Sequence, residues 1–196
     1  MLPKKSNERS DQILQALAAM LEHPQRVRIT IAALAAQLGV SESSLYRCFH
    51  NKSAMFEALI EFIERTLFVL INKILQEEPC GVQQIESLLL LLLGFSRKNP
   101  GMTRILIGDV LINENEHLQL RINQLHDRLE ATLKQALRFA VREHRINGNC
   151  DVTAQANLLM CFVVGRWHQF VKSGFMRDPV ANWNVQRLIV LPPEQL

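Results

Sequence analysis

The sequence predicts an all-α protein of about nine helices, with an N-terminal helix-turn-helix domain followed by a C-terminal helical dimerisation domain. Three observations predict this architecture. Apolar residues make up 48% of the 196 residues, which favours a packed globule over a disordered chain. These residues recur at the three- and four-residue spacing of helices, and proline or glycine separates the periodic segments. We expect the first domain to cover residues 1–52 and the second to cover residues 53–196.

Residues 30–52 carry the most distinctive pattern, two short helices joined by a tight turn. Thr30 can cap the first helix, Gly39 supplies a left-handed turn, and Ser41 is a natural cap for a second helix from Glu42 to about Phe49. The inward positions are Leu45 and Phe49. The other faces of the second helix keep four polar side chains: Ser43, Ser44, Tyr46 and Arg47. Such a helix suits insertion into the major groove of DNA, although an ordinary helical hairpin has similar spacing.

The position of the charges supports a nucleic-acid partner. The net charge is +3, but residues 1–56 hold seven Lys and Arg against four Asp and Glu, while the remainder holds fifteen of each sign. All the excess positive charge therefore lies in residues 1–56, on the expected DNA-binding domain, as attraction to phosphates requires. The longest apolar run, Leu88 to Phe95, is far shorter than the roughly 18 residues of a membrane span. We expect a soluble, cytosolic protein.

The sequence offers no sign of an enzyme or a metal site. Its four cysteines are scattered, without paired spacing or a histidine at metal-ligand distance, so they read as buried or incidental thiols in a reducing cytosol. Nucleophile elbows, dinucleotide fingerprints, phosphate loops and zinc-protease motifs are missing. The first residues do not resemble a signal peptide. We therefore expect no catalytic residue, no metal and no cofactor.

The helix-turn-helix segment is flanked by elements that can support it. Residues 1–8 read as a short basic arm, and a helix is expected from about Arg9 to Glu22. In the loop that follows, Arg26 and Arg28 can either reach the DNA backbone or stay in solvent. Lys52 lies at the start of a long helix that we expect to run from Ser53 to about Glu77, where backbone N–H groups and the helix dipole favour a phosphate.

This long helix has apolar residues on two faces. Phe62 and Val69 lie off its main stripe, seven residues apart on a common face, so the helix either meets a partner or packs against another helix of its own domain. The stripe expected to face the core is Phe56, Leu59, Ile60, Ile63, Leu67, Leu70, Ile71 and Ile74.

The next helix, about Val82 to Lys98, contains six consecutive leucines and is expected to be apolar all round, at the centre of the C-terminal domain. Near its end, Gly94 leaves a gap in the surface beside Arg97 and Lys98. After the Asn99-Pro100 cap, the remaining helices are expected at about 100–111, 116–145, 153–172 and 180–191. The helix at 153–172 is apolar on more than one face, with Leu158, Leu159, Phe162, Val163, Trp167 and Phe170.

The pattern T-(x)3-LA-(x)3-GVS-(x)3-LYR-x-F-(x)2-K resembles the DNA-binding signature of tetracycline-repressor-type (TetR) regulators. It combines the turn glycine, the capping serine, the Leu-Tyr pair and the trailing lysine. Within that family, residues 55–64, 90–106 and 121–135 are similar to the nucleoid occlusion factors of gamma-proteobacteria. The similarity extends over about residues 9–190.

The TetR resemblance implies a homodimer on a DNA palindrome. In that family the last two long helices form a four-helix bundle with the same pair of a second subunit. The two recognition helices would then lie about 34–36 Å apart, matching successive major grooves. We expect Arg47 and Lys52 to be the cationic anchors. The side chains expected to position phosphates and contact the groove are Thr30, Ser41, Ser43, Ser44 and Tyr46.

The closer resemblance implies a function in cell division. Nucleoid occlusion factors lie in the cytoplasm on the nucleoid, bind dispersed palindromic sites in double-stranded DNA, and antagonise assembly of the tubulin-like protein FtsZ. They hold the C-terminal tail of FtsZ in a groove between their fourth and fifth helices. The matching positions here are Phe62, Asn72, Leu91, Gly94 and Lys98.

The chain departs from the nucleoid occlusion pattern at several positions. Its N-terminal arm is less basic, and Ala33, Cys48 and His50 stand where the family has lysine, histidine and proline, which bears on the preferred DNA sequence. In the groove, Leu70 replaces an arginine and removes one charge contact. Two other functions fit a TetR-type chain: a repressor that responds to a small ligand in its C-terminal domain, and a plain repressor without ligand.

Overall fold

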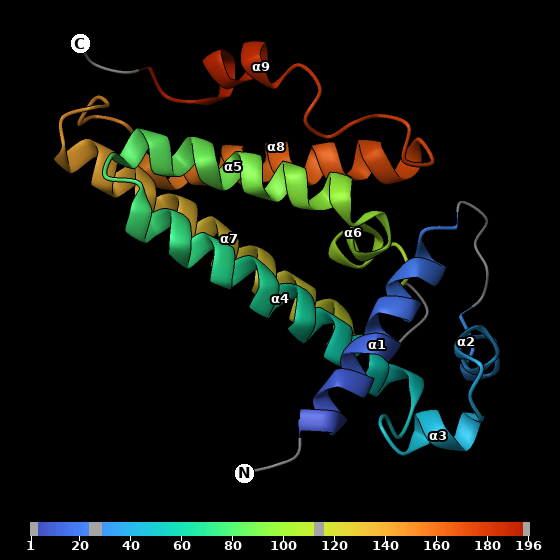
Figure 1. The fold of residues 1–196 in the computed structure, drawn as a ribbon. Helices are drawn as coiled ribbons and strands as arrows, with labels where there is room; N and C mark the ends of the chain where they lie inside the picture. The colour runs from blue at the N-terminus through green and yellow to red at the C-terminus, as the bar shows by residue number, and fades with distance from the viewer. Residues whose placement is uncertain (1–3, 24–28, 112–115, 194–196) are drawn as a thin grey trace.

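The computed structural model describes residues 4–23, 29–111 and 116–193, which form nine α-helices (Figure 1). The predicted all-α class is confirmed. Across the described part of the chain, no helix combines the length and apolarity needed to cross a membrane. The helices in order are α1 (Lys4–Leu21), α2 (Ile31–Leu38), α3 (Glu42–Tyr46), α4 (Lys52–Glu77), α5 (Gly81–Lys98), α6 (Pro100–Leu106), α7 (Glu116–Arg142), α8 (Val152–Lys172) and α9 (Trp183–Val190).

The first three helices form a small cluster at one end of the molecule (Figure 1). Helix α1 packs against α2, α4 and α6, and α2 packs against α3. Leu17, Leu34 and Leu45 contribute one fully buried side chain from each of the three helices. Gly39 ends α2 in the left-handed conformation (φ 64°), and the chain turns there into α3. The predicted helix-turn-helix is therefore present.

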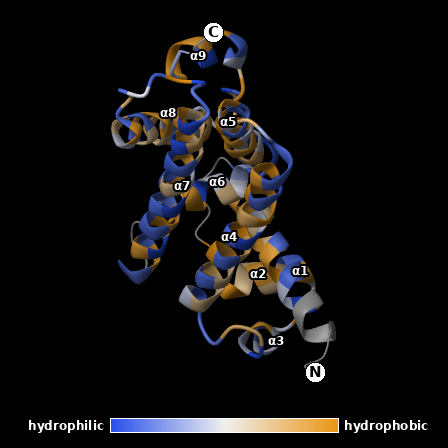
Figure 2. Cartoon of the chain, turned by 90° about the vertical axis from the view of Figure 1, so that its left-hand side faces the viewer, coloured by the Kyte–Doolittle hydropathy of each residue, from blue (hydrophilic) through white to orange (hydrophobic). Residues whose placement is uncertain are grey.

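The remaining helices form two layers. Figure 1 shows α4 beside α7 and α5 beside α8, and Figure 2 shows the long α4 and α7 descending side by side from the α5–α8 layer. Helix α5 packs against α4, α7 and α8. Its first residue, Gly81, approaches α7 so closely that an added Cβ would lie 2.4 Å from the backbone nitrogen of Ala140. The buried Trp167 of α8 donates from its indole nitrogen to the Leu92 carbonyl of α5 (3.1 Å).

Helix α6 connects the N-terminal cluster to the rest of the molecule. A Cβ on Gly101 would lie 2.0 Å from the carbonyl oxygen of Ala18, so only glycine allows α6 to approach α1 this closely. Arg104 of α6 donates to the Leu21 carbonyl at the end of α1 (3.2 Å) and pairs with Asp109 (2.9 Å). The position of α1 is thus set by contacts from α6 as well as from α4.

Several predicted boundaries are wrong. Helix α1 begins at Lys4, so most of the segment expected as an arm is helical. The recognition helix α3 ends at Tyr46 rather than near Phe49. Helix α6 ends at Leu106, well before the expected residue 111, and Gly108 follows in the left-handed conformation (φ 72°). The seventh helix ends at 142 rather than 145, and the last begins at 183 rather than 180. The arginines at 26 and 28 lie outside the described residues.

Two expectations about the core are also corrected. Leu70, expected on the core stripe of α4, is 39% exposed, and Ile74 is only half-buried. The six-leucine helix is not buried all round, because Leu90 is 36% exposed and Leu91 is half-buried. On α8 most of the apolar residues expected to be surplus are buried inside the same chain: Leu159, Val163, Trp167 and Phe170. Leu158 remains exposed and Phe162 is half-buried.

Candidate nucleic-acid interface and peptide groove

The turn between α2 and α3 presents a row of hydroxyl groups at the exposed end of the N-terminal cluster. The Thr30 hydroxyl caps α2 by accepting from the Ala33 amide (3.1 Å). Ser41 occupies the N-cap position of α3 in extended conformation, but its side chain makes no capping hydrogen bond. Its hydroxyl instead lies 3.0 Å from that of Ser43, and both side chains are exposed. The exposed hydroxyls of Ser41 and Ser43 can therefore hydrogen-bond to a ligand, next to the acidic Glu42 in the first turn of α3.

Ser44 does not lie on an exposed face of α3, contrary to the prediction. Its side chain is 5% exposed, because it points toward α1. The hydroxyl accepts hydrogen bonds from Arg9 of α1 (2.6 Å) and from Arg47 (3.2 Å). Ser44 thus orients two arginines rather than presenting its own hydroxyl. The role of Arg9 could not be predicted from local spacing, since Arg9 lies 35 positions before Ser44 in the chain.

The remaining predicted DNA-contacting residues lie on the outer side of the cluster. Tyr46 is 49% exposed at the end of α3, and Arg47 is exposed beside it. Lys52 is the first residue of α4, with its ammonium 5.4 Å from the Phe56 ring. Asn51 caps this helix by accepting from the Ala54 amide (2.8 Å). Hydroxyls, a phenol and three cations including Arg9 therefore gather around α3, a set that suits phosphate and base contacts.

A second candidate site is a groove of about 580 Å³ between α4 and α5. Helix α4 contributes Phe62, Thr66 and Leu70, which are spaced four residues apart and so share one face. Gln15 of the N-terminal cluster and Met102 of α6 also line it. Helix α5 and the residue after it supply the opposite side: Leu90, Leu91, Gly94, Phe95, Arg97, Lys98 and Asn99.

The groove has an apolar floor and a cationic end. At Gly94 an added Cβ would meet nothing within 4 Å, so the groove is open there. Lys98 is exposed and makes no ion pair with any described residue, while Arg97 pairs with Asp178 (3.5 Å). On the α4 side, the Arg65 guanidinium lies 5.7 Å from the Phe62 ring. An extended peptide with apolar and acidic side chains would match this surface.

The structure brings together four of the five residues predicted for peptide binding. Phe62, Leu91, Gly94 and Lys98 all line the groove, but Asn72 does not; it is exposed on α4 two residues beyond Leu70, on a different side of the helix. The sequence-based prediction missed Thr66 and Leu90. The four-residue spacing from Phe62 through Thr66 to Leu70 was the available signal for the first.

The described residues contain no cluster of three or more His, Cys, Asp or Glu side chains that could hold a metal ion. The four cysteines are free thiols.

Comparison with known proteins identifies the class that this architecture defines. Residues 27–59 match the model for bacterial regulatory proteins of the tetR family, and residues 81–193 match the SlmA-like model for the tetracyclin repressor-like C-terminal domain. A TetR transcription regulator from Haloarcula marismortui has the same fold, with a TM-score of 0.80 over 96% of this chain and 100% of that chain, at 16% identity. The molecule is thus built as a TetR-family regulator.

Comparison with curated relatives places the chain in one family within this class. The nucleoid occlusion factor SlmA of Alteromonas mediterranea is 49% identical over 93% of both chains, and that of Marinomonas sp. is 46% identical over 94% of both. The chain belongs to the SlmA family of nucleoid occlusion factors, within the TetR regulators. The resemblance seen in the sequence is therefore confirmed.

Proposed function

We propose that this protein is a nucleoid occlusion factor. It binds palindromic chromosomal sites as a homodimer, and in the bound state it antagonises FtsZ assembly so that no septum closes over the DNA. One observation carries the proposal. This chain of the SlmA family has both a helix-turn-helix and an apolar groove with a cationic end. On this proposal the protein lies in the cytoplasm on the nucleoid.

The DNA-binding half rests on the surface around α3. Ser43 and Tyr46 reach the edge of the DNA major groove, while Arg47 and Lys52 contact the phosphate backbone of the DNA. Thr30 and Ser41 lie at helix N-termini, where a phosphate is favoured. Ser44 acts indirectly, because its buried hydroxyl accepts from both Arg9 and Arg47 and so fixes where these cations lie. The proposed DNA-binding domain covers residues 1–52, and its boundary with the C-terminal domain lies at the first turn of α4.

The FtsZ-binding half rests on the groove. An apolar side chain of the FtsZ tail would pack against Phe62 and Leu91, its backbone would approach Gly94, and an acidic side chain would lie near Lys98. Asn72 lies outside the groove and contacts the tail only if the peptide extends past Leu70. The groove also includes Gln15 of α1, so the tail would contact the N-terminal cluster as well as α4 and α5.

Dimerisation follows from the family, and exposed apolar residues near the C-terminus support it. Leu158 of α8 is 52% exposed, and α9 exposes Val185, Leu188 and Ile189 by 63%, 72% and 77%. Isolated exposed apolar residues are common, but several together mark an interaction surface. A second copy related by a two-fold axis would cover the same residues on both subunits.

A binding experiment with the FtsZ tail tests the groove. Phe62→Ala should weaken binding of a fluorescent peptide with the FtsZ C-terminal sequence by about tenfold or more, since aromatic anchors dominate such interfaces. Binding to an operator DNA duplex should stay unchanged. Phe68→Ala is the matched control, because Phe68 lies on the same helix under Arg128 and outside the groove. Equal loss of peptide and DNA binding in Phe62→Ala would contradict the proposal.

Chromosomal occupancy distinguishes nucleoid occlusion from ordinary repression. Crosslinking and sequencing of bound DNA in the cells of origin should give dozens of dispersed sites, depleted around the replication terminus. One or two peaks beside promoters would instead identify a TetR-type repressor of a few genes, and the FtsZ role would be withdrawn.

A further inference from the structure

A second cavity lies where α7 passes into α8, away from both sites described above. It has a volume of about 650 Å³, within the range of small-molecule sites. Helix α7 contributes Gln135, Arg138, Val141 and Arg142. The connection to α8 and the first residue of α8 complete the lining: Gly148, Cys150 and Val152.

The wall made by the connection is held in place by local hydrogen bonds. The Asn149 amide donates to the Asn147 side chain (2.9 Å), and the Cys150 amide donates to the Asn147 carbonyl (2.9 Å). Asp151 then caps α8 by accepting from the amides of Thr153 and Ala154 (2.9 and 3.1 Å). The cavity is therefore bounded by an ordered turn and two helices, and a ligand would not have to order the wall.

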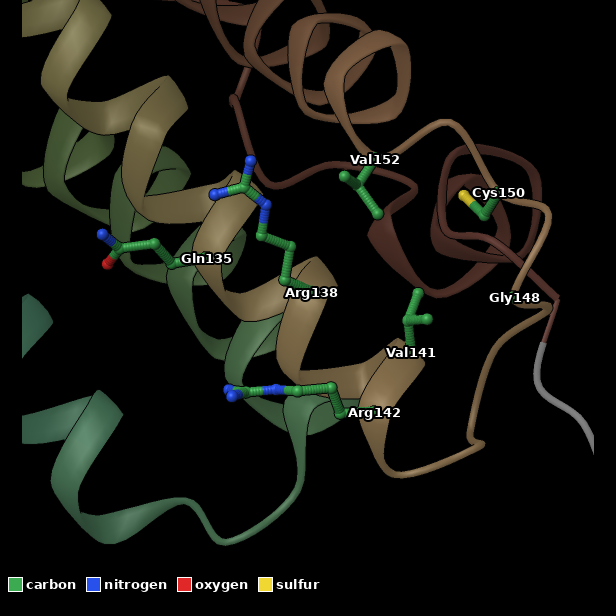
Figure 3. A pocket seen from close by; sticks show the side chains of 7 residues that line it. All are labelled: Gln135, Arg138, Val141, Arg142, Gly148, Cys150 and Val152. Carbon is green, nitrogen blue, oxygen red and sulfur yellow. The ribbon is translucent and has the colours of Figure 1, made fainter.

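The cavity is polar on one side and apolar on the other. Figure 3 shows Arg138 and Arg142 extending from the same side of α7, next to Gln135, while Val141 and Val152 point towards each other across the space. Cys150 lies farther along the apolar side (Figure 3). An elongated ligand could therefore place one end on the arginines and the other between the two valines.

No acidic side chain in the described part of the molecule pairs with the arginines of the cavity. Within the described residues, neither Arg138 nor Arg142 has an ion pair; the only ring contact is that of Arg142 with Phe139 of its own helix (5.7 Å). The acids on either side in sequence have other hydrogen-bond partners. Glu143 accepts from the Gly81 amide (2.7 Å), Glu130 accepts from the Asn157 side chain (3.1 Å), and Asp151 caps α8. Two like charges four residues apart repel one another, so an anion bound between them is favoured.

We propose that this cavity binds an amphipathic anion, a small molecule with one carboxylate or phosphate group and an apolar chain. The anionic group accepts hydrogen bonds from Arg138 and Arg142, which present planar donors suited to both groups. The apolar chain lies over Val141, Val152 and Cys150. This site is independent of the peptide groove, since the two share no lining residue.

Titration calorimetry on the full-length protein tests the proposal with four probes. Dodecanoate and dodecyl phosphate carry an anion and an apolar chain, dodecanol lacks the charge, and acetate lacks the chain. At least one of the two anions should bind, and the stronger identifies the head group. Dodecanol and acetate should each bind at least about tenfold more weakly. Dodecanol loses the charge-assisted hydrogen bonds to the arginines, and acetate loses the apolar contacts.

Two sets of variants locate the binding. Arg138→Gln and Arg142→Gln should each weaken binding of the preferred anion by about tenfold. Arg177→Gln is the matched control, because Arg177 is exposed on the connection between α8 and α9 and does not line the cavity. Binding should also protect the Cys150 thiol from alkylation by iodoacetamide, with the ligand-free protein at the same concentration as the reference.

Three outcomes would overturn the proposal. Dodecanol binding as tightly as the anions would show an apolar site without charge recognition. Unchanged affinity in both arginine variants would place the ligand elsewhere. Protection of Cys150 in the ligand-free dimer, and its loss on dilution to monomer, would show that a second copy of the chain fills the cavity.

Discussion

Leu70 leaves the α4 side of the peptide groove without a charge of its own. It is exposed beside Phe62 and Thr66, where the family pattern has arginine, so this part of the groove is apolar. The cations near the groove are Lys98, with no ion pair to a described residue, Arg97, which pairs with Asp178 (3.5 Å), and Arg65, which lies over the Phe62 ring and 4.0 Å from Asp11 of α1. In the proposed complex, apolar contact would therefore have a larger share in peptide binding than the family pattern implies.

Leu70→Arg should restore the missing charge contact. Since an exposed ion pair contributes about 0.2–1 kcal/mol, the FtsZ tail peptide should bind up to about fivefold more tightly at low salt. The gain should disappear near 1 M salt, where the screening length is about 3 Å. Fluorescence anisotropy over a salt series measures this. Val69→Arg adds the same charge one residue away, outside the groove, and should leave affinity nearly unchanged; an equal gain there would indicate non-specific attraction.

The helices themselves were largely predictable, while their ends and neighbours were not. Spacing predicted α2, α4 and α8, and Thr30 was predicted as the cap of α2, because it interacts with an amide only three residues away. The caps Asn51 of α4 and Asp151 of α8 were not predicted. The end of α6 depends on the left-handed conformation of Gly108, which has no local sequence rule beyond glycine itself. In the recognition helix, too, local sequence predicts the helix but not what its side chains contact. Its spacing predicted four outward polar side chains, but the burial of Ser44 depends on Arg9 of another helix.

Long-range packing also explains the errors in the core. A helix with six leucines looks uniformly apolar in sequence, yet Leu90 opens into the groove because α4 covers only part of that face. The groove was found from Phe62, Gly94 and Lys98 through family resemblance. Its closure by Gln15 of α1 and Met102 of α6 requires the relative placement of four helices, which periodicity does not encode.

The close contact between α1 and α6 gives a prediction at the level of elements. Gly101→Ala should destabilise the protein by about 1–3 kcal/mol, the usual cost of overpacking, because the new methyl would meet the Ala18 carbonyl unless the helices separate. Operator affinity should fall with it, since α1 supports α3 through Arg9. Urea unfolding and DNA titration measure the two effects.

The control is the same substitution in another helix. Gly94→Ala introduces a methyl into open space, so it should be neutral or stabilise by up to about 1 kcal/mol through helix propensity. If Gly101→Ala proved as benign as Gly94→Ala, the contact between α1 and α6 would not be as tight as described.

Across the whole molecule, two buried titratable groups connect elements distant in sequence. Asp109 is 6% exposed and accepts from Arg104 of α6 and Lys172 of α8 (2.9 and 3.2 Å). Burial raises the pKa of Asp109, but the hydrogen bonds from Arg104 and Lys172 outweigh it, and the net pKa lies below its ordinary value. Because Arg104 also holds the end of α1, this cluster links α8 to the N-terminal cluster. Protonation of Asp109 therefore destabilises the fold only in strongly acidic solution.

His126 should make the protein sensitive to milder acid. It lies on α7, with its ring 5.9 Å from Trp167 of α8 and a hydrogen bond to the backbone of Leu106. Burial lowers the pKa of His126, and nearby His168 lowers it further, against opposing effects of the Leu106 hydrogen bond and Asp127. The folded protein therefore binds this proton more weakly than the unfolded chain does, whose histidine titrates near pH 6.5. The free energy of unfolding should decrease as the pH falls below about 6.5, since the unfolded state then holds more protons.

Urea unfolding at intervals between pH 8 and pH 5 tests this prediction. The wild-type midpoint should decline below about pH 6.5, and His126→Gln should flatten that decline even if it lowers stability throughout the range. His50→Gln replaces a histidine before α4, outside the contacts between α6, α7 and α8, and is the control that should retain the wild-type slope. An identical slope in all three proteins would mean that the acid sensitivity arises elsewhere. Protonation of His126 between α6, α7 and α8 would then leave the free energy of unfolding unchanged.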